Sequence, residues 1–202
     1  RSMVKEYFTT MKLMKPNGEW AHPKLAEIGE MVKAGIVAIT DDGNPVENNQ
    51  MMRRALEYSR IFDVLVIDHC EDRQLASGGH MNEGSAATRL GLYGLSRVAE
   101  ELDVARDVML GRITGGRIHI AHISTQESLF WVRQAKKQGI DVTCEVTPHH
   151  FILTDNDIKN YDTNFKMYPP LRTASDVENI IKAISDGTID CIATDHAPHT
   201  SL

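Results

Sequence analysis

The chain has few cysteines and no long apolar run. Its 202 residues include three cysteines, none of them in a CxxC pair, which argues against a disulfide scaffold and favours free thiols in a reducing compartment. No apolar run approaches the roughly 18–20 residues that a membrane-spanning helix needs. No signal-peptide pattern is visible. We therefore expect a cytoplasmic protein without a membrane partner.

Basic residues are a minority as well. Lysine and arginine number 22 against 28 acidic residues, for a formal net charge of −6. No basic stripe offers phosphate contacts, so we expect no nucleic-acid partner. No GxGxxG or P-loop lysine stands at a predicted strand–helix turn, which argues against a nucleotide-binding open sheet. Hydrophobic residues make up 42% and charged residues 25% of the chain, as is typical of a globular domain.

Strand-like and helix-like segments alternate along the chain. The strand-like segments are rich in isoleucine and valine with little polar alternation, which is typical of parallel strands buried on both faces. The predicted strands are 36–40, 64–69, 118–123, 140–147 and 189–194, with a weaker candidate near 7–14. Predicted helices cover 23–34, 50–60, 97–111, 124–139 and 173–187. The pattern indicates an α/β fold, either part of a parallel barrel or an open five-stranded sheet.

Helical periodicity also predicts which side chains enter the core. In the helix over 97–111 these are Val98, Leu102, Ala105 and Met109. In the helix over 173–187 they include Ile180 and Ile181, and Thr173 to Asp176 forms a capping box at its start. A second capping box is predicted over Ser124 to Glu127.

Metal-capable side chains stand at or just after the carboxyl ends of four predicted strands. They are Asp42, His69, His122 and Asp195. Charged and imidazole groups next to apolar strands are costly unless they bind metal, pair with charge or do chemistry. The carboxyl ends of parallel strands meet at the mouth of a barrel, and zinc prefers histidine nitrogens and carboxylate oxygens. The sequence therefore predicts a metal site at that mouth.

The remaining histidines are weaker candidates. Side-chain alternation along 118–123 places His122 on the face of Ile118 and Ile120, so His119 is expected on the other face, towards the helices or as a satisfied core histidine. Three others are left open between a supporting role and a structural one: His149, His150 and His196.

Seven motifs occur in order along about residues 20–202. They are Thr40-Asp-Asp-Gly43, Asp68-His-Cys-Glu71, Gly79-His-Met-Asn-Glu-Gly84, Ala121-His-Ile-Ser-Thr125, Val142-Thr-Cys-Glu-Val-Thr-Pro-His-His150, Phe165-Lys-Met-Tyr-Pro-Pro-Leu-Arg172 and Ala193-Thr-Asp-His-Ala-Pro-His199. Their order and spacing resemble the bacterial class I dihydroorotases of the amidohydrolase superfamily. The resemblance implies that 1–202 is part of a metal-dependent (β/α)8 TIM barrel, about strands 3 or 4 to 8, without its first strands and C-terminal portion.

The resemblance also implies roles for individual residues. Asp42 would bridge two zinc ions, His69 and His122 would bind one of them, and Asp195 would bind the other and serve as general base and acid. The implied reaction is the reversible hydrolysis of (S)-dihydroorotate to N-carbamoyl-L-aspartate in pyrimidine biosynthesis.

Substrate contacts are implied for two further residues. His199 would hold the substrate, and Tyr168 stands where the family usually has a substrate-binding asparagine. Tyrosine keeps a hydrogen-bond donor there but changes its reach and bulk.

One family motif does not occur in the chain. The family takes two more zinc ligands from a His-x-His on its first strand, so we expect 1–202 to be inactive alone. Two alternatives remain: a hydantoinase- or allantoinase-like amidohydrolase, and a non-catalytic subunit that scaffolds aspartate transcarbamoylase. The pair Asp41-Asp42 favours a dihydroorotase over the first, whose members commonly use a carboxylated lysine there. A homodimer is the other expected assembly.

Overall fold

Six parallel strands form the main sheet of the part of the chain that the structure describes. The structure is a computed structural model that describes the backbone of residues 5–7 and all of residues 25–197. In spatial order the strands are β1 (Lys5–Tyr7), β2 (Ala38–Thr40), β3 (Leu65–Asp68), β6 (Ile118–Ile120), β7 (Val142–Val146) and β8 (Cys191–Ile192). The five predicted strands are confirmed, with shorter bounds. Of the weaker candidate at 7–14, only the first residue falls in β1, and residues 8–14 lie outside the described residues.

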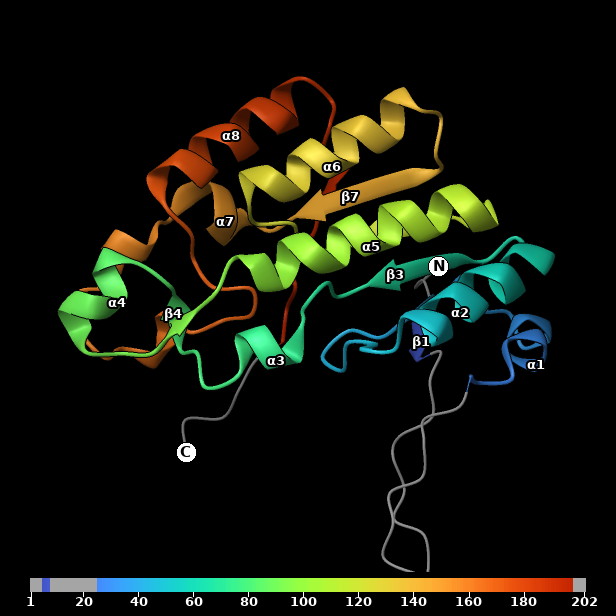
Figure 1. The fold of residues 1–202 in the computed structure, drawn as a ribbon, viewed down its shortest axis with the longest axis horizontal. Coiled ribbons are helices and arrows are strands. Elements are labelled where there is room, and N and C mark those ends of the chain that lie inside the picture. The colour runs from blue at the N-terminus through green and yellow to red at the C-terminus, as the bar shows by residue number, and fades with distance from the viewer. Residues whose placement is uncertain (1–4, 8–24, 198–202) are drawn as a thin grey trace, which may run out of the picture.

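A row of helices covers one face of this sheet. After α1 (Ile28–Lys33), the helices α2 (Asn49–Ile61), α5 (Val98–Thr114), α6 (Gln126–Lys137) and α8 (Ala174–Ser185) each lead from one strand to the next. Figure 1 shows α2, α5, α6 and α8 side by side over the strands, and neighbours in this row pack together. Repeated strand–helix units with parallel strands are the building plan of a (β/α)8 barrel. No helix within 5–7 and 25–197 is long and apolar enough to cross a membrane.

Side chains that precede the helices define where they begin. Asn48 accepts a hydrogen bond from the Met51 amide at 2.9 Å at the start of α2, as an N-cap residue does. The capping box predicted for α8 is confirmed in Thr173 and Asp176. The box predicted at Ser124 is wrong by one residue, because Thr125 caps α6 and the Ser124 hydroxyl instead donates to Glu100.

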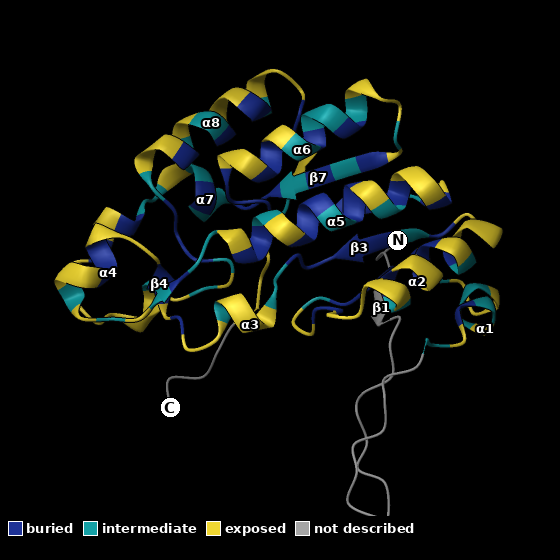
Figure 2. Cartoon of the chain, in the orientation of Figure 1, coloured by how far each residue is buried: buried dark blue, intermediate teal, exposed yellow. Residues whose placement is uncertain are grey.

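The main core lies between the helix row and the sheet. Isoleucines and valines from the strands meet the inner faces of the helices. Figure 2 shows β3 largely buried and β7 alternating between buried and intermediate, beneath helices whose outer faces are exposed. The other sheet face carries a smaller cluster of Ala38, Ile67 and Ala121 with Leu65 packed against it. Burial on both faces explains why the strands read as nearly continuous apolar runs.

Helix α5 is rotated relative to the sequence prediction. Val98, Leu102 and Met109 are 41%, 51% and 49% exposed, so their predicted core positions are wrong, although Ala105 is buried. Valines 104 and 108 face the core instead, together with three buried acidic residues: Glu100, Asp103 and Asp107. A prediction from the spacing of apolar residues assigns these carboxylates to the outer face of α5. The predicted inner face of the helix was therefore wrong. In α8, Ile180 is buried as predicted, but Ile181 is 48% exposed.

The insertion after β3 packs against the long loop after β7. It contains α3 (Arg73–Ala76), β4 (Met81–Asn82), α4 (Ser85–Leu90) and β5 (Gly94–Leu95), and the long loop follows α7 (Pro148–Ile152) and includes short turns at Asp155–Asp157 and Thr163–Phe165. Met81, Ile158 and Leu171 form a second small core between the two segments. The two segments are therefore held together beside the carboxyl ends of the strands, where loops of such barrels shape their pockets.

Candidate metal centre

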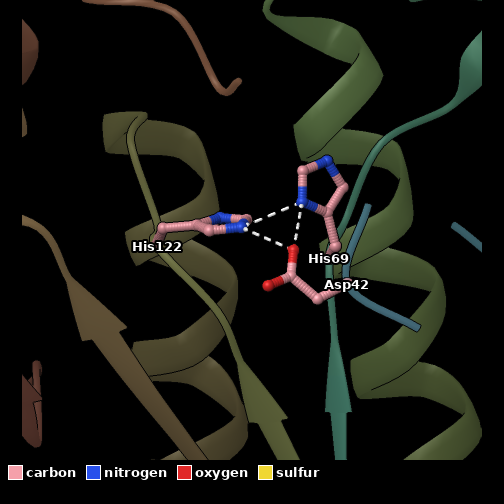
Figure 3. Close-up of side chains that lie close together, drawn as sticks. All are labelled: Asp42, His69 and His122. Atoms are coloured by element: carbon pink, nitrogen blue, oxygen red, sulfur yellow. Dashed lines mark hydrogen bonds and ion pairs between the residues drawn. The ribbon is translucent and has the colours of Figure 1, made fainter. Parts of the chain in front are cut away.

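Three side chains from three neighbouring strand ends converge on one point. Asp42 follows β2, His69 follows β3 and His122 follows β6. The Asp42 Oδ1 atom lies 3.3 Å from His69 Nδ1 and 3.7 Å from His122 Nε2, and the two nitrogens are 2.9 Å apart. Figure 3 shows the carboxylate and both imidazoles pointing toward one another. Of the predicted site residues, the structure brings these three together at the carboxyl ends of the parallel strands.

Backbone geometry, not strand alternation, brings His122 to this point. Strand β6 ends at Ile120, and His122 has a positive φ of 32°, a conformation that non-glycine residues adopt at some cost. The prediction that His119 faces the helices is wrong. Ile118 and Ile120 occupy that face, and His119 lies on the opposite one. The alternative prediction, that the ring nitrogens of His119 have hydrogen-bond partners, is confirmed by contacts to Thr143 and Glu145.

Asp41 joins the strand ends that carry two of these donors. It is fully buried, and its carboxylate accepts the His69 amide at 2.9 Å and the Val46 amide at 2.8 Å. Carboxylates that accept backbone N–H groups form strong, charge-assisted hydrogen bonds. The Asp41 carboxylate therefore holds the loop after β2 against the end of β3. The sequence reasoning missed this role, although burial of the first aspartate of the pair follows from its place at the end of an apolar strand.

The ionisation of the cluster follows from its contacts. Hydrogen bonds with His122 and His69 hold the pKa of Asp42 well below its ordinary value. Burial alone would lower the pKa of His69, but hydrogen bonds with Asp42 and Glu71 outweigh it and raise this pKa to about 10. Glu71 contacts the outer nitrogen of His69, Nε2, at 3.3 Å, as carboxylates that orient metal-binding histidines do.

The donor set fits zinc. Zinc binds histidine nitrogen and carboxylate oxygen at about 2.0–2.2 Å, so donors on two corners of a tetrahedron stand roughly 3.3–3.6 Å apart. The separations of 2.9, 3.3 and 3.7 Å in the structure bracket this range. Two imidazole nitrogens that face each other at hydrogen-bond distance need a proton or a cation between them. Asp42, His69 and His122 are therefore a coherent three-donor metal group.

A buried ionic network lies behind the cluster. Arg106 on α5 contacts Asp68 at 3.1 Å, Asp103 at 3.1 Å and Asp107 at 2.8 Å. Burial raises the pKa of Asp68 to about 7 and that of Asp103 to about 6, and the pKa of Asp107 is also raised by burial. Asp68 immediately precedes His69, so this network supports the backbone that presents a metal donor.

The raised pKa of Asp103 predicts a pH-dependent stability. A carboxyl group whose folded-state pKa lies above its unfolded value of 3.8 stabilises the fold fully below pH 4 and loses that contribution as pH rises through about 6. Replacing Asp103 with asparagine removes this titration. Relative to the unchanged chain, the variant's free energy of unfolding should therefore rise by roughly 2–3 kcal/mol between pH 4 and 7. Urea unfolding at several pH values measures the difference.

A matched control for this prediction is Asp141→Asn, because the Asp141 side chain is 62% exposed and forms a surface ion pair with Arg117. Its stability relative to the unchanged chain should stay nearly constant over the same pH range. Parallel pH profiles for Asp103→Asn and the unchanged chain would contradict the buried titration.

The other predicted site residues do not join the three-donor group. Among the described residues, Asp195 is exposed, has a positive φ of 47° and is not one of the converging donors. The charges of Asp195 and His122 both act on His149, whose pKa is lowered, mainly by burial. The Tyr168 side chain is partly exposed, and its hydroxyl donates to the Gly79 carbonyl at 3.1 Å. His199 lies outside the described residues.

The histidines left open by the sequence have different environments. His150 is buried, contacts Thr147 Oγ1 at 2.6 Å and the Pro169 carbonyl at 3.1 Å, and so has a structural role. His149 shares the Thr147 hydroxyl, and His196 is exposed. A small pocket beside the site is lined in part by His69, Glu71 and two residues that the sequence reasoning did not single out: Glu100 and Arg172.

Three comparisons agree with this geometry. The family model described as "Dihydro-orotase-like" matches residues 18–128. A dihydroorotase from Acetivibrio thermocellus is 56% identical over 176 residues, which cover 87% of this chain and 41% of that protein. Of solved structures, an L-hydantoinase (dihydropyrimidinase) from Arthrobacter aurescens has a TM-score of 0.73 at 21% identity, covering 86% of this chain and 41% of that one. A dihydroorotase from Saccharomyces cerevisiae in complex with 5-fluoroorotic acid has a TM-score of 0.63 at 16% identity, covering 85% and 49%.

The structural similarities establish the fold as part of a (β/α)8 TIM barrel. The open five-stranded sheet, the other architecture that the sequence allowed, is therefore excluded. The chain spans about 41% of the length of the curated dihydroorotase that it matches. The family match covers more than half of the chain and includes all three converging donors. The chain belongs to the dihydro-orotase-like family.

Proposed function

We propose that the protein of which this chain forms part is a metal-dependent dihydroorotase. It would hydrolyse (S)-dihydroorotate reversibly to N-carbamoyl-L-aspartate in pyrimidine biosynthesis. The observation that carries this proposal is the convergence of Asp42, His69 and His122 in a chain of this family. Residues 1–202 would supply one part of the barrel domain, and the rest of the protein would complete the site.

The donors of this chain would hold zinc, with Asp42 shared between two ions. Zinc bound there would supply Lewis-acid polarisation of the scissile carbonyl and make water a better nucleophile. Glu71 would keep His69 in position through the contact at Nε2. Burial of both imidazoles limits their motion, so the donors are preorganised for the ion.

Proton transfer is assigned to Asp195. Its carboxylate would take a proton from the attacking water and deliver it to the leaving ring nitrogen, as a general base and then a general acid. The influence of its charge on His149, which also lies within range of His122, supports its placement near the metal group. His199 and Tyr168 would contact the substrate, the Tyr168 hydroxyl exchanging the Gly79 carbonyl for the substrate as its acceptor.

The geometry disfavours the two alternatives. A carboxylated lysine is not needed here, because the Asp42 carboxylate already lies within 3.7 Å of both histidines. A non-catalytic scaffold for aspartate transcarbamoylase would have no use for buried imidazoles aimed at a carboxylate, since such groups cost stability. A homodimer and a cytoplasmic location stay predictions, and the three cysteines, which form no disulfide, are consistent with the latter.

The test uses the complete protein, stripped of metal and then reloaded with zinc. We expect zinc-dependent turnover of dihydroorotate, with hydantoin and dihydrouracil as much poorer substrates. At saturating zinc the variant Asp195→Asn should lose at least about a hundredfold in kcat, since general acid–base catalysis is worth 10²–10⁴-fold. Faster turnover of hydantoin would support the amidohydrolase alternative, and zinc-loaded protein without any turnover would support the scaffold.

A further inference from the structure

A second group of metal-capable side chains lies on the face of the sheet opposite the helices. His119 on β6, Glu145 on β7 and Cys191 on β8 bring their donor atoms within 4.8 Å of one another. None of the three belongs to the Asp42 group. Glu145 and Cys191 are direct partners in the β7–β8 register, and His119 is paired with Thr143, two residues before Glu145. The group therefore follows from strand register, because side chains two residues apart share a face.

The separations suit a tetrahedral ion. His119 Nε2 lies 3.1 Å from Glu145 Oε2, and Cys191 Sγ lies 4.0 Å from the same oxygen. Donors around zinc, bound at about 2.0–2.3 Å, stand roughly 3.3–3.7 Å apart. Small side-chain rotations on a rigid sheet would bring both distances to this range.

His119 is already oriented for such a role. Its Nδ1 atom lies 2.8 Å from the Thr143 hydroxyl, while Nε2 faces Glu145. Metal-binding histidines commonly hold their outer nitrogen in a hydrogen bond of this kind, which orients the ring and selects the tautomer. The side chains of His119 and Glu145 are 9% and 14% exposed, so both are well constrained.

We propose that His119, Glu145 and Cys191 form a second, thiolate-containing site for zinc or a similar divalent transition metal. One thiolate and one carboxylate would balance the two positive charges of the ion, and the imidazole would add a neutral ligand. Binding would displace the thiol proton of Cys191 to solvent. The sulfur ligand would favour zinc over magnesium or calcium, which prefer oxygen donors. This site is independent of the dihydroorotase proposal.

Cys191 differs from the other two cysteines in a way that makes the site testable. Cys70 and Cys144 are buried, whereas Cys191 is exposed. Burial raises the pKa of Cys144 to about 12 and also raises that of Cys70. In the native chain a thiol reagent should therefore react with Cys191 first, and metal bound at the site should protect it.

The experiment titrates cobalt(II) into the reduced, metal-free chain carrying Asp42→Asn, which weakens the first metal group. We expect near-ultraviolet absorption from thiolate-to-cobalt charge transfer that saturates at one ion per chain. Saturating zinc should slow alkylation of Cys191 at least about tenfold, as mass spectrometry of each cysteine would show. Cys191→Ser should abolish the charge-transfer band, and Glu145→Gln should weaken cobalt binding.

The control is Cys144→Ala, whose side chain faces the helix layer and whose loss should leave the band intact. Bound cobalt without a thiolate band, or alkylation of Cys191 at the same rate with and without zinc, would overturn the proposal. If Asp42→Asn fails to fold, the alkylation measurement on the unchanged chain decides alone. Because none of these readouts is catalytic, failure of this site would leave the dihydroorotase proposal untouched.

Discussion

Replacing Arg106 with leucine is expected to lower the free energy of unfolding by about 3–5 kcal/mol at pH 7. Arg106 is the cation that contacts Asp68, Asp103 and Asp107, and its side chain is only 10% exposed. Its Nη1 also donates to the Val46 carbonyl at 2.8 Å. Leucine fills part of the volume but leaves buried carboxylates without a counter-charge, which is among the costliest single changes in a protein interior.

The loss from Arg106→Leu should be larger at pH 8 than at pH 5. At the lower pH the carboxyl groups that have lost Arg106 can take up protons, since burial already raises the pKa of Asp68 to about 7. Urea unfolding followed by circular dichroism measures both values. The matched control is Arg53→Leu, because the ion pair of Arg53 with Glu57 is nearly half exposed and such pairs contribute about 0–1 kcal/mol. Equal losses in the two variants would refute the role of the buried network.

Replacing Asp42 with asparagine should weaken zinc binding by more than about a hundredfold, since even changes outside the ligand shell commonly cost 10–100-fold. The substitution keeps the shape of the side chain but removes the charge that both His69 and His122 contact. Asparagine oxygen is a much poorer zinc ligand than carboxylate. The measurement is competition for zinc between the chain and a chromophoric chelator.

The control for Asp42→Asn is Glu47→Gln, which removes an exposed carboxylate on the same connection between β2 and α2. That variant should bind zinc with unchanged affinity. In the chain carrying Cys191→Ser the hundredfold effect should persist, because the two metal groups share no residue. A loss of less than about threefold in Asp42→Asn would remove Asp42 from the ligand set, since removal of a ligand costs more than a change outside the ligand shell.

The parallel sheet was predictable because its signal is local. Apolar runs such as 36–40 and 64–69 are long enough to identify a strand, and the helical periodicity of 50–60 between them is equally local. The face of α5 was not predictable in the same way. Its inner positions carry Asp103 and Asp107, and the ion pairs that these carboxylates form with Arg106 offset the cost of burying them.

Some features of the metal centre likewise follow from the sequence, and others follow only from the fold. The sequence by itself determined that Asp42, His69 and His122 stand at the carboxyl ends of parallel strands, and parallel pairing then places such ends on one edge. Only the tertiary structure decided that His122 reaches the cluster through a positive φ and that His119 faces Glu145 and Cys191. Distances between side chains depend on strand register and on where each strand stops, and neither quantity is written in the local pattern of residues.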